Sequence, residues 1–264
     1  MFSSTTRGVA AAAGLALATA SLAACSPSSS DHGLAVVATT TQICDYVTQI
    51  AAHSADISLD KTDAAGKSSH VGAQNDGAAL TMRLTCLLAP NASAHEHEMT
   101  PAQTSALAQA DVMAVSGVDL EHFLDDAVVS SGFKGRMVVT SGVLTAADID
   151  NPGTPDPEGA YTIDRGSERV DVAPWPFPPE EAGEEPEFRF DPHVWTSPKG
   201  ARVQVANLGA GLAAAAPDAA SSINAATASY LEDIDALDQW TAEAIETVPE
   251  GQRVLFTSHD AFGY

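Results

Sequence analysis

The sequence has few cysteines and few basic residues. Its 264 residues include 3 cysteines, and 12 lysines and arginines stand against 35 aspartates and glutamates, for a formal net charge of −23. So acidic a chain will not hold nucleic acid through phosphate contacts, which excludes that class of partner. A CxxC pair, a Cys/His zinc ribbon and the HExxH motif of zinc peptidases are all absent. After the N-terminal region, no apolar run reaches membrane-spanning length.

The N-terminal region has the organisation of an export signal. Arg7 precedes an apolar run that ends at Ala20, and the small residues of LAAC lead to Cys25. A cysteine directly after Leu-Ala-Ala resembles the bacterial lipobox, in which that cysteine is lipidated; the alternative is an ordinary secretory signal with a chance cysteine. We expect residues 1–24 to be a lipoprotein signal peptide and 25–33 a flexible tether. The protein would then lie at the bacterial surface, outside the cytoplasmic membrane and anchored to it by lipid on Cys25.

The other two cysteines, Cys44 and Cys86, are candidates for a disulfide. An exported protein meets an oxidising compartment, where free thiols are less common. Pairing would close a loop of about 43 residues, which the chain-entropy estimate values at roughly 4 kcal/mol. The alternative is two separate buried thiols.

Two periodicities alternate along the chain from Leu34. Apolar runs typical of buried strands are followed by segments with helical spacing of their apolar residues. We expect strands at 34–40, 80–88, 112–115 and 136–140, and helices at 42–52, 101–110 and 120–129. Such alternation predicts a parallel, doubly wound α/β sheet covered on both faces, forming an N-terminal lobe over residues 34–216.

Two polar stretches interrupt this pattern. Residues 151–190 hold eight prolines, ten acidic residues and three arginines, with few aliphatic residues. Such a stretch buries too little apolar surface to offset its ordering entropy, so we expect a mobile surface insertion. A smaller polar insertion is expected at about 60–77.

The last part of the chain predicts a long helix followed by a new strand. A helix begins at Ser197-Pro198, where serine suits the N-cap and proline the first helical position. A second helix over 217–249, with apolar residues at alternating spacings of four and three, would be a linker roughly 45 Å long. The apolar run RVLFT (253–257) then indicates a strand. Residues 250–264 would begin a C-terminal lobe that is largely missing from this chain.

Three histidines occupy loops of the kind that bind ligands in doubly wound sheets. His95 follows the strand at 80–88, His193 precedes a helix, and His259 follows RVLFT. Ligands of such sheets bind beyond the carboxyl ends of the strands, so the three imidazoles can converge on one point. Imidazoles that meet without carboxylate partners suit a metal ion better than acid–base chemistry. The spacing alone leaves open that each is an exposed loop histidine.

Three segments resemble the metal-ligand regions of the zinc- and manganese-binding solute-binding lipoproteins of metal ABC importers. The first is PNASAHEHEMTPAQTSALAQADVMAVSGVDLEHFL (Pro90–Leu124), with a histidine, then Thr-Pro, a helix and a GxxLE element. FDPHVWTSPKG (Phe190–Gly200) is similar to the second region and FTSHDAFGY (Phe256–Tyr264) to the third. The motifs occur in the family's order, and the similarity extends from about Leu34 to the last residue.

The resemblance implies a fold, a ligand set and a role. The fold would be two α/β lobes joined by one long backbone helix, and His95, His193 and His259 would be the metal ligands. The chain would not be an enzyme. It would carry a divalent metal as cargo, Zn²⁺ before Mn²⁺, to an ABC permease in the membrane, and would be a monomer when complete. The family's fourth ligand is an acidic residue late in the second lobe, and His97 could serve as a spare ligand.

Two other classes of function remain as alternatives. The first is a zinc-dependent hydrolase with three histidine ligands, an open water position and Glu96 as base. The absence of HExxH and the position of Glu96 beside its own ligand speak against it. The second is a surface adhesin, because some members of the family are described as adhesins, although no segment identifies a host partner.

Overall fold

The structure is a computed structural model that describes residues 1, 33–74, 77–153, 156, 159–179, 183, 186, 188–257 and 259–264. The chain divides into two units, Met1–Asp31 and His32–Tyr264, and the description below concerns the second. Apart from Met1, the expected signal peptide lies outside the described residues, as do Cys25 and almost all of the expected tether. Within the described ranges, no helix combines the length and the apolar character that crossing a membrane requires.

A seven-stranded sheet, ordered β3-β2-β4-β1-β5-β6-β7, forms the centre of the second unit. Every neighbouring pair is parallel except β2 and β3, which pair antiparallel. The strands are β1 (Leu34–Ala38), β2 (Ile57–Thr62), β3 (Ser68–Gly72), β4 (Leu80–Cys86), β5 (Val112–Val115), β6 (Arg136–Val139) and β7 (Thr162–Asp164). The predicted α/β class with a mostly parallel sheet is confirmed.

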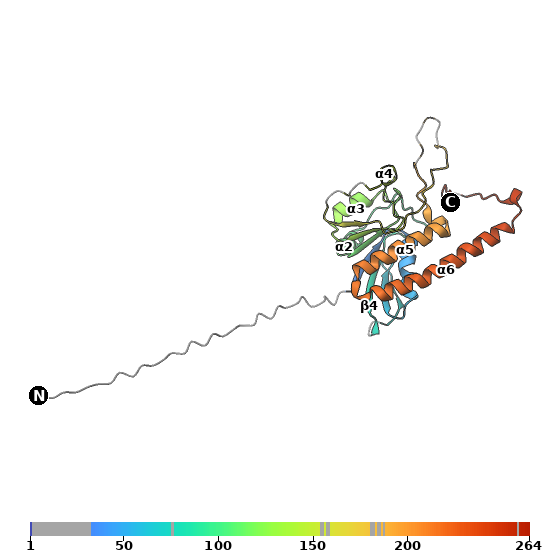
Figure 1. Cartoon of the computed structure of the whole chain (residues 1–264). Coiled ribbons are helices and arrows are strands. Elements are labelled where there is room, and N and C mark those ends of the chain that lie inside the picture. Colours follow the sequence, from blue (N-terminus) through green and yellow to red (C-terminus); the bar gives the residue numbers. More distant parts are fainter. Residues whose placement is uncertain are drawn as a thin grey trace. The chain divides into compact units, whose positions relative to one another are not determined.

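Helices cover both faces of the sheet. They are α1 (Thr41–Ala52), α2 (Pro101–Ala108), α3 (Leu124–Ser131), α4 (Ala146–Asp150), α5 (Pro198–Ala215) and α6 (Ala220–Glu246). Short 3₁₀ helices are η2 (Val194–Thr196), η3 (Pro217–Ala219) and η4 (Glu250–Gln252). Helices α1, α5 and α6 pack on one face of the sheet, and α2 and α3 pack on the other (Figure 1). Each set forms a cluster of buried apolar side chains with the strands.

Alternation within the strands explains the two cores. In β1, Val36 and Ala38 belong to the cluster under α1, α5 and α6, whereas Val37 belongs to the cluster under α2 and α3. Successive side chains of a strand point to opposite faces, so a strand buried on both sides needs apolar residues at consecutive positions. This is why apolar runs such as VMAV in β5 predicted strands correctly.

Helix starts also follow from local chemistry. Thr100 accepts a hydrogen bond from Gln103 N, the Gln103 side chain accepts one from Thr100 N, and Pro101 occupies the first turn of α2. This capping box satisfies backbone donors that would otherwise lack partners. The predicted start of α5 at Pro198 is confirmed, with Ser197 at the N-cap position, although the Ser197 side chain makes no capping hydrogen bond.

Parts of both predicted insertions are ordered where the structure describes them. Residues 57–72 form β2 and β3 at one edge of the sheet. In the 151–190 stretch, Thr162–Asp164 is strand β7, which pairs with β6 at the other edge. Val170 and Phe188 are buried, and Pro174 forms a β-bridge with Phe190. The composition of these segments suggests no ordered structure. They are ordered by backbone hydrogen bonds to an existing sheet edge and by a few buried apolar side chains.

We expect Val170→Ala to lower the free energy of unfolding by about 2–3 kcal/mol, because two buried methyl groups are lost and a cavity remains. Val170 packs with Val118, Val143 and Val194 beside the sheet. Urea denaturation of the metal-free protein measures the effect. Val129→Ala is the matched control, since Val129 is 82% exposed. If the two variants are equally stable, Val170 does not pack against the sheet, and the stretch around it is the mobile insertion that its composition suggests.

The long helix forms where the sequence predicted it, but the strand after it does not. In Figure 1, α6 runs beside α5, and its C-terminal part extends away from the sheet, where Leu237 and Trp240 are exposed. Residues 253–257 are not a strand, and Phe256 is 92% exposed. Apolar content suits a strand only if a neighbour supplies the hydrogen bonds, and none of the described strands lies beside this segment.

Candidate metal centre

Three histidines from separate parts of the chain converge on one point. His95 lies in the loop after β4, His193 directly before η2, and His259 in the segment after η4. One ring nitrogen from each lies within 4.8 Å of the other two. The Nε2 atoms of His193 and His259 are 3.2 Å apart. The structure therefore brings together all three residues that the sequence singled out.

The spacing of one pair of these nitrogens matches that of two ligands in a tetrahedral zinc site. A tetrahedral zinc ion with Zn–N bonds of about 2.0–2.1 Å places two ligand nitrogens about 3.3 Å apart. The pair formed by His193 and His259 already has this separation. No carboxylate joins the cluster of three among the described residues.

His193 is buried and its orientation is determined by Asp191. The Nδ1 atom of His193 donates to Asp191 Oδ1 at 2.8 Å, and the backbone N–H of His193 donates to the same oxygen at 2.9 Å. With the proton on Nδ1, the lone pair on Nε2 is free for a metal. Burial acts to raise the pKa of the Asp191 carboxyl, but the hydrogen bonds from His193 outweigh it, and the pKa lies below its ordinary value.

The other carboxylate oxygen of Asp191 holds the segment that carries the third histidine. Gly263 N donates to Asp191 Oδ2 at 3.0 Å, and the Tyr264 hydroxyl donates to the Asp191 carbonyl at 2.7 Å. A side chain at position 263 would leave no room, since an added Cβ would lie 2.2 Å from that same oxygen. Asp191 thus links the second and third predicted ligands.

His95 is oriented by a backbone carbonyl. Its Nδ1 atom lies 3.3 Å from the carbonyl oxygen of Leu120, which can only accept, so the proton is on Nδ1 and Nε2 carries the lone pair. Burial, and secondly the nearby His193, lower the pKa of His95 to about 4. The imidazole is therefore neutral at neutral pH, the form that binds metals.

Aromatic side chains lie against the imidazoles of His95 and His193. Phe188 lies 5.1 Å from His95 between ring centroids, and Trp195 lies 5.3 Å from His193. Trp175 packs edge-on against Phe188 at 5.0 Å. A cavity of about 310 Å³ opens beside His95, His193 and His259. An apolar wall on one side strengthens metal–ligand interactions by excluding water.

The remaining described histidines are placed differently. His97 packs against Phe123, and its Nε2 atom is buried without a hydrogen-bond partner. His122 lies 5.9 Å from His95 between ring centroids, although it supplies no atom to the cluster of three. His53 and His70 bond to Asp233 and Asp60, respectively, away from the site. Glu96, the base of the alternative hydrolase, is exposed, and His32 lies outside the described residues.

Sequence reasoning missed the residues that orient the ligands. Asp191 stands two positions before His193, and this Asp-x-His spacing was a usable signal because a side chain can bond to an N–H two residues ahead. Phe188 and Trp175 gave no such signal, since their stretch was read as an unpacked insertion. Their contacts with the imidazoles depend on how the stretch folds back against the sheet.

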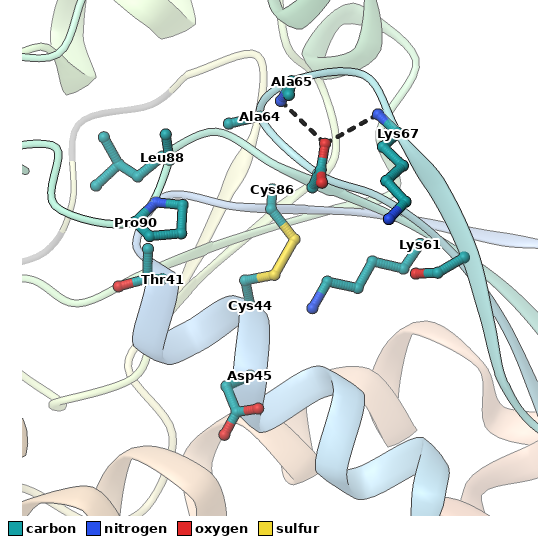
Figure 2. Close-up of a pocket in the computed structure, with 13 residues that line it drawn as sticks. Thr41, Cys44, Asp45, Lys61, Ala64, Ala65, Lys67, Cys86, Leu88 and Pro90 are labelled. Carbon is teal, nitrogen blue, oxygen red and sulfur yellow. Dashed lines mark hydrogen bonds between the residues drawn. A yellow bond between two sulfur atoms is a disulfide. The ribbon is translucent and has the colours of Figure 1, made fainter.

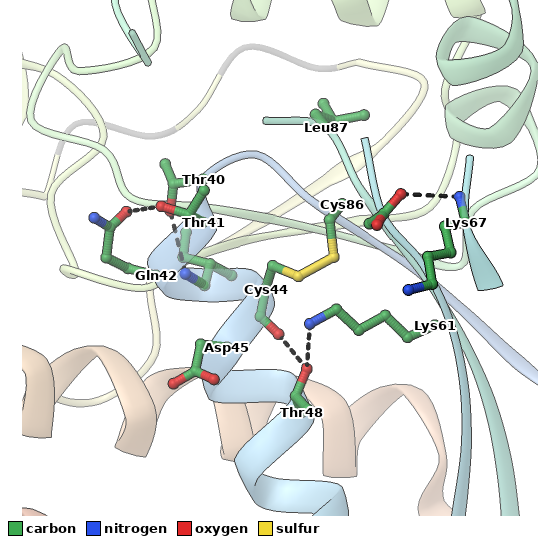
Figure 3. The surroundings of a disulfide bond; sticks show 12 residues. Thr40, Thr41, Gln42, Cys44, Asp45, Thr48, Lys61, Lys67, Cys86 and Leu87 are labelled. Atoms are coloured by element: carbon green, nitrogen blue, oxygen red, sulfur yellow. Dashed lines mark hydrogen bonds between the residues drawn. A yellow bond between two sulfur atoms is a disulfide. The ribbon is translucent and has the colours of Figure 1, made fainter. Parts of the chain in front are cut away.

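Cys44 and Cys86 form a disulfide that joins α1 to the end of β4. Figure 2 shows it in the wall of a cavity of about 470 Å³, together with the turn in which Asp63 Oδ1 accepts from the backbone N–H groups of Ala65 and Lys67. Lys61 donates to Thr48 on α1, close to the bridge (Figure 3). This cavity adjoins the one lined by the histidines, since Thr41 and Leu88 line both.

Comparison with known proteins identifies the family of the chain. A family model described as zinc-uptake complex component A, periplasmic (ZnuA) matches residues 77–264. The manganese-binding lipoprotein MntA of Bacillus subtilis is 28% identical over 236 residues, covering 89% of this chain and 58% of the relative. The iron-binding protein YfeA of Yersinia pestis is 28% identical over 177 residues, covering 66% and 46%. The chain thus spans about half the length of these relatives.

Solved structures show the same fold. The periplasmic zinc-binding protein TroA from Treponema pallidum superposes with a TM-score of 0.53 at 21% sequence identity, covering 88% of this chain and 62% of TroA. At that identity the likeness concerns the fold alone. Because the family model covers well over half of the chain, and includes all three converging histidines, this chain belongs to the family of periplasmic zinc-uptake components A (ZnuA).

Proposed function

We propose that this chain captures a divalent metal ion outside the cytoplasmic membrane and delivers it to an ABC-type permease. The observation that carries the proposal is the convergence of the three imidazoles of His95, His193 and His259. Two of them have Nδ1 committed to an acceptor of the protein, so that Nε2 is left for the ion. Lipid on Cys25 would anchor the protein beside its permease.

We propose zinc before manganese as the cargo. Imidazole nitrogen suits zinc, whereas manganese prefers carboxylate and other oxygen ligands. The names of the relatives differ in the metal, since MntA is called manganese-binding and YfeA iron-binding. The choice of metal therefore rests on the donor atoms of this chain, and all three of them are nitrogen.

Competition between the two metals tests this proposal. By the usual order of affinities at nitrogen sites, zinc should bind at least about 100-fold more tightly than manganese. Isothermal titration with each metal, and with zinc displacing manganese, measures the ratio. His259→Asp is the matched variant, because one oxygen ligand should narrow the ratio. Equal or tighter binding of manganese to the parent protein would overturn the assignment of zinc, and binding of neither metal would overturn metal capture.

A further inference from the structure

Glu121 is a buried carboxylate at the carboxyl edge of the sheet that none of the steps above uses. It accepts three hydrogen bonds. Oε1 accepts from the Thr39 hydroxyl at 2.7 Å and from Ser116 N at 2.6 Å, and Oε2 accepts from Gly117 N at 3.0 Å. Thr39 directly follows β1 and Ser116 directly follows β5. The carboxylate therefore joins the ends of two neighbouring strands where the sheet meets the metal centre.

The turn between β5 and Glu121 has an unusual backbone. Gly117, Val118 and Asp119 have φ values of 86°, 57° and 57°, three consecutive residues in the left-handed region. A β-branched residue such as valine rarely adopts this conformation, so the surroundings must hold it in place. Val118 N donates to Val143 O at 2.8 Å, and Asp119 N donates to Leu144 O at 3.0 Å. Glu121 ties down the start of the same turn through Gly117 N.

The turn ends at the carbonyl group that orients His95. Leu120 directly follows the three left-handed residues and directly precedes Glu121. Its carbonyl oxygen is the acceptor 3.3 Å from His95 Nδ1. The side chain of Leu120 is fully buried, which leaves the carbonyl little freedom to follow the imidazole if the turn relaxes.

We propose that Glu121 is a positioning residue for His95. By holding the left-handed turn, it aims the Leu120 carbonyl at Nδ1 and so keeps the Nε2 lone pair of His95 directed at His193 and His259. As regards metal affinity, this role rests on the proposed function. The orientation of the imidazole exists in the metal-free protein and can be tested there.

Glu121→Gln is the sharpest variant because it keeps the shape and removes one acceptor. All three neighbours of the carboxylate are donors in the structure. The amide nitrogen of glutamine would have to face either Gly117 N–H or the pair formed by Ser116 N–H and the Thr39 hydroxyl. In both orientations a donor meets a donor, and the turn loses a buried hydrogen bond.

The experiment reads the His95 tautomer and the zinc affinity separately. Nitrogen-15 NMR of the metal-free protein reports which ring nitrogen carries the proton, and the His95 signals are assigned by their loss in His95→Asn. We expect the parent to show the Nδ1–H form and Glu121→Gln to show a mixture of tautomers. Zinc affinity should fall by about 10- to 100-fold, the usual effect of losing a group that orients a ligand.

Two further variants keep the test decisive. Thr39→Val removes one donor to Glu121 and should shift the tautomer in the same direction, so it carries the test if Glu121→Gln does not fold. Leu212→Ala is the stability control, because Leu212 is fully buried on α5, in the cluster that packs on the opposite face of the sheet from α2 and α3. It should lower the melting temperature and leave both readouts unchanged. A His95 tautomer unchanged in both Glu121→Gln and Thr39→Val would overturn the inference, whether or not the protein binds zinc.

Discussion

Replacing His259 with alanine is expected to weaken zinc binding by about 100- to 1000-fold. Structural zinc sites with four ligands bind with about 10–16 kcal/mol, or roughly 2.5–4 kcal/mol for each ligand. Each 1.4 kcal/mol is about tenfold in affinity. His259 is exposed, so its imidazole contributes little to the fold. Isothermal titration with zinc measures the loss, and the melting temperature of the metal-free variant should equal that of the parent.

His70→Ala is the matched control for this prediction. His70 lies on β3, where it bonds to Asp60 and to the carbonyl oxygen of Ala73, and it is no part of the cluster of three. Its loss should leave zinc affinity unchanged. If His259→Ala and His70→Ala bind zinc alike, the three-histidine site is wrong, and the search for ligands would turn to the carboxylates near His95.

Removing the disulfide with Cys44→Ala and Cys86→Ala is expected to lower the free energy of unfolding by about 4 kcal/mol. The bridge spans a sequence separation of 42 residues, and closing a loop of this length restricts the unfolded chain by about that amount. For a protein of this size, the melting temperature should fall by roughly 8–16 °C. Thermal unfolding of the metal-free double variant and parent measures the difference.

A reducing agent supplies the control for the disulfide prediction. Reduction opens the bridge without changing any side chain other than the two cysteines, so the parent in excess dithiol should melt close to the double variant. The double variant itself should not respond to the dithiol. A parent that melts at the same temperature with and without reductant, after the thiols are shown to be free, would mean that the bridge adds no stability.

The helices and strands that the sequence predicted well are those whose formation depends on their own residues and near neighbours in the chain. Strand β5 matches its predicted bounds, since its four apolar residues are buried on both faces. Helix α5 begins at the predicted proline. Strands β2, β3 and β7 were missed. SSHVG in β3 and TID in β7 carry polar residues that suit a sheet edge, and ISLDKT in β2 is buried only in its first half. Such a strand exists only because a neighbouring strand bonds to it, and that neighbour is remote in the sequence or separated by a turn.

The candidate site divides in the same way. The three histidines could be selected from sequence because the carboxyl ends of parallel strands meet at one edge, so loops that follow them meet as well. The residues that orient them could not. Glu121 and Thr39 lie 82 positions apart, and Asp191 and Gly263 lie 72 apart. The hydrophobic periodicity of the segments does not indicate which remote residue each of them bonds to.

By itself, the sequence determined that this protein has a parallel α/β sheet, a long helix after it, and three imidazoles in loops that can meet. Hydrophobic periodicity and helix caps depend on a few neighbouring residues, and the direction of parallel strands follows a general rule of topology. These features can therefore be predicted from the sequence. The tertiary structure alone decided which ring nitrogen each of His95 and His193 presents, because a carbonyl at Leu120 and a carboxylate at Asp191 take the other one. It also decided that, within the acidic, proline-rich stretch, Thr162–Asp164 pairs with the sheet and Val170 and Phe188 are buried, whereas RVLFT is exposed. Hydrogen bonds to a particular neighbour outweigh composition in both cases, and a neighbour exists only once the chain has folded.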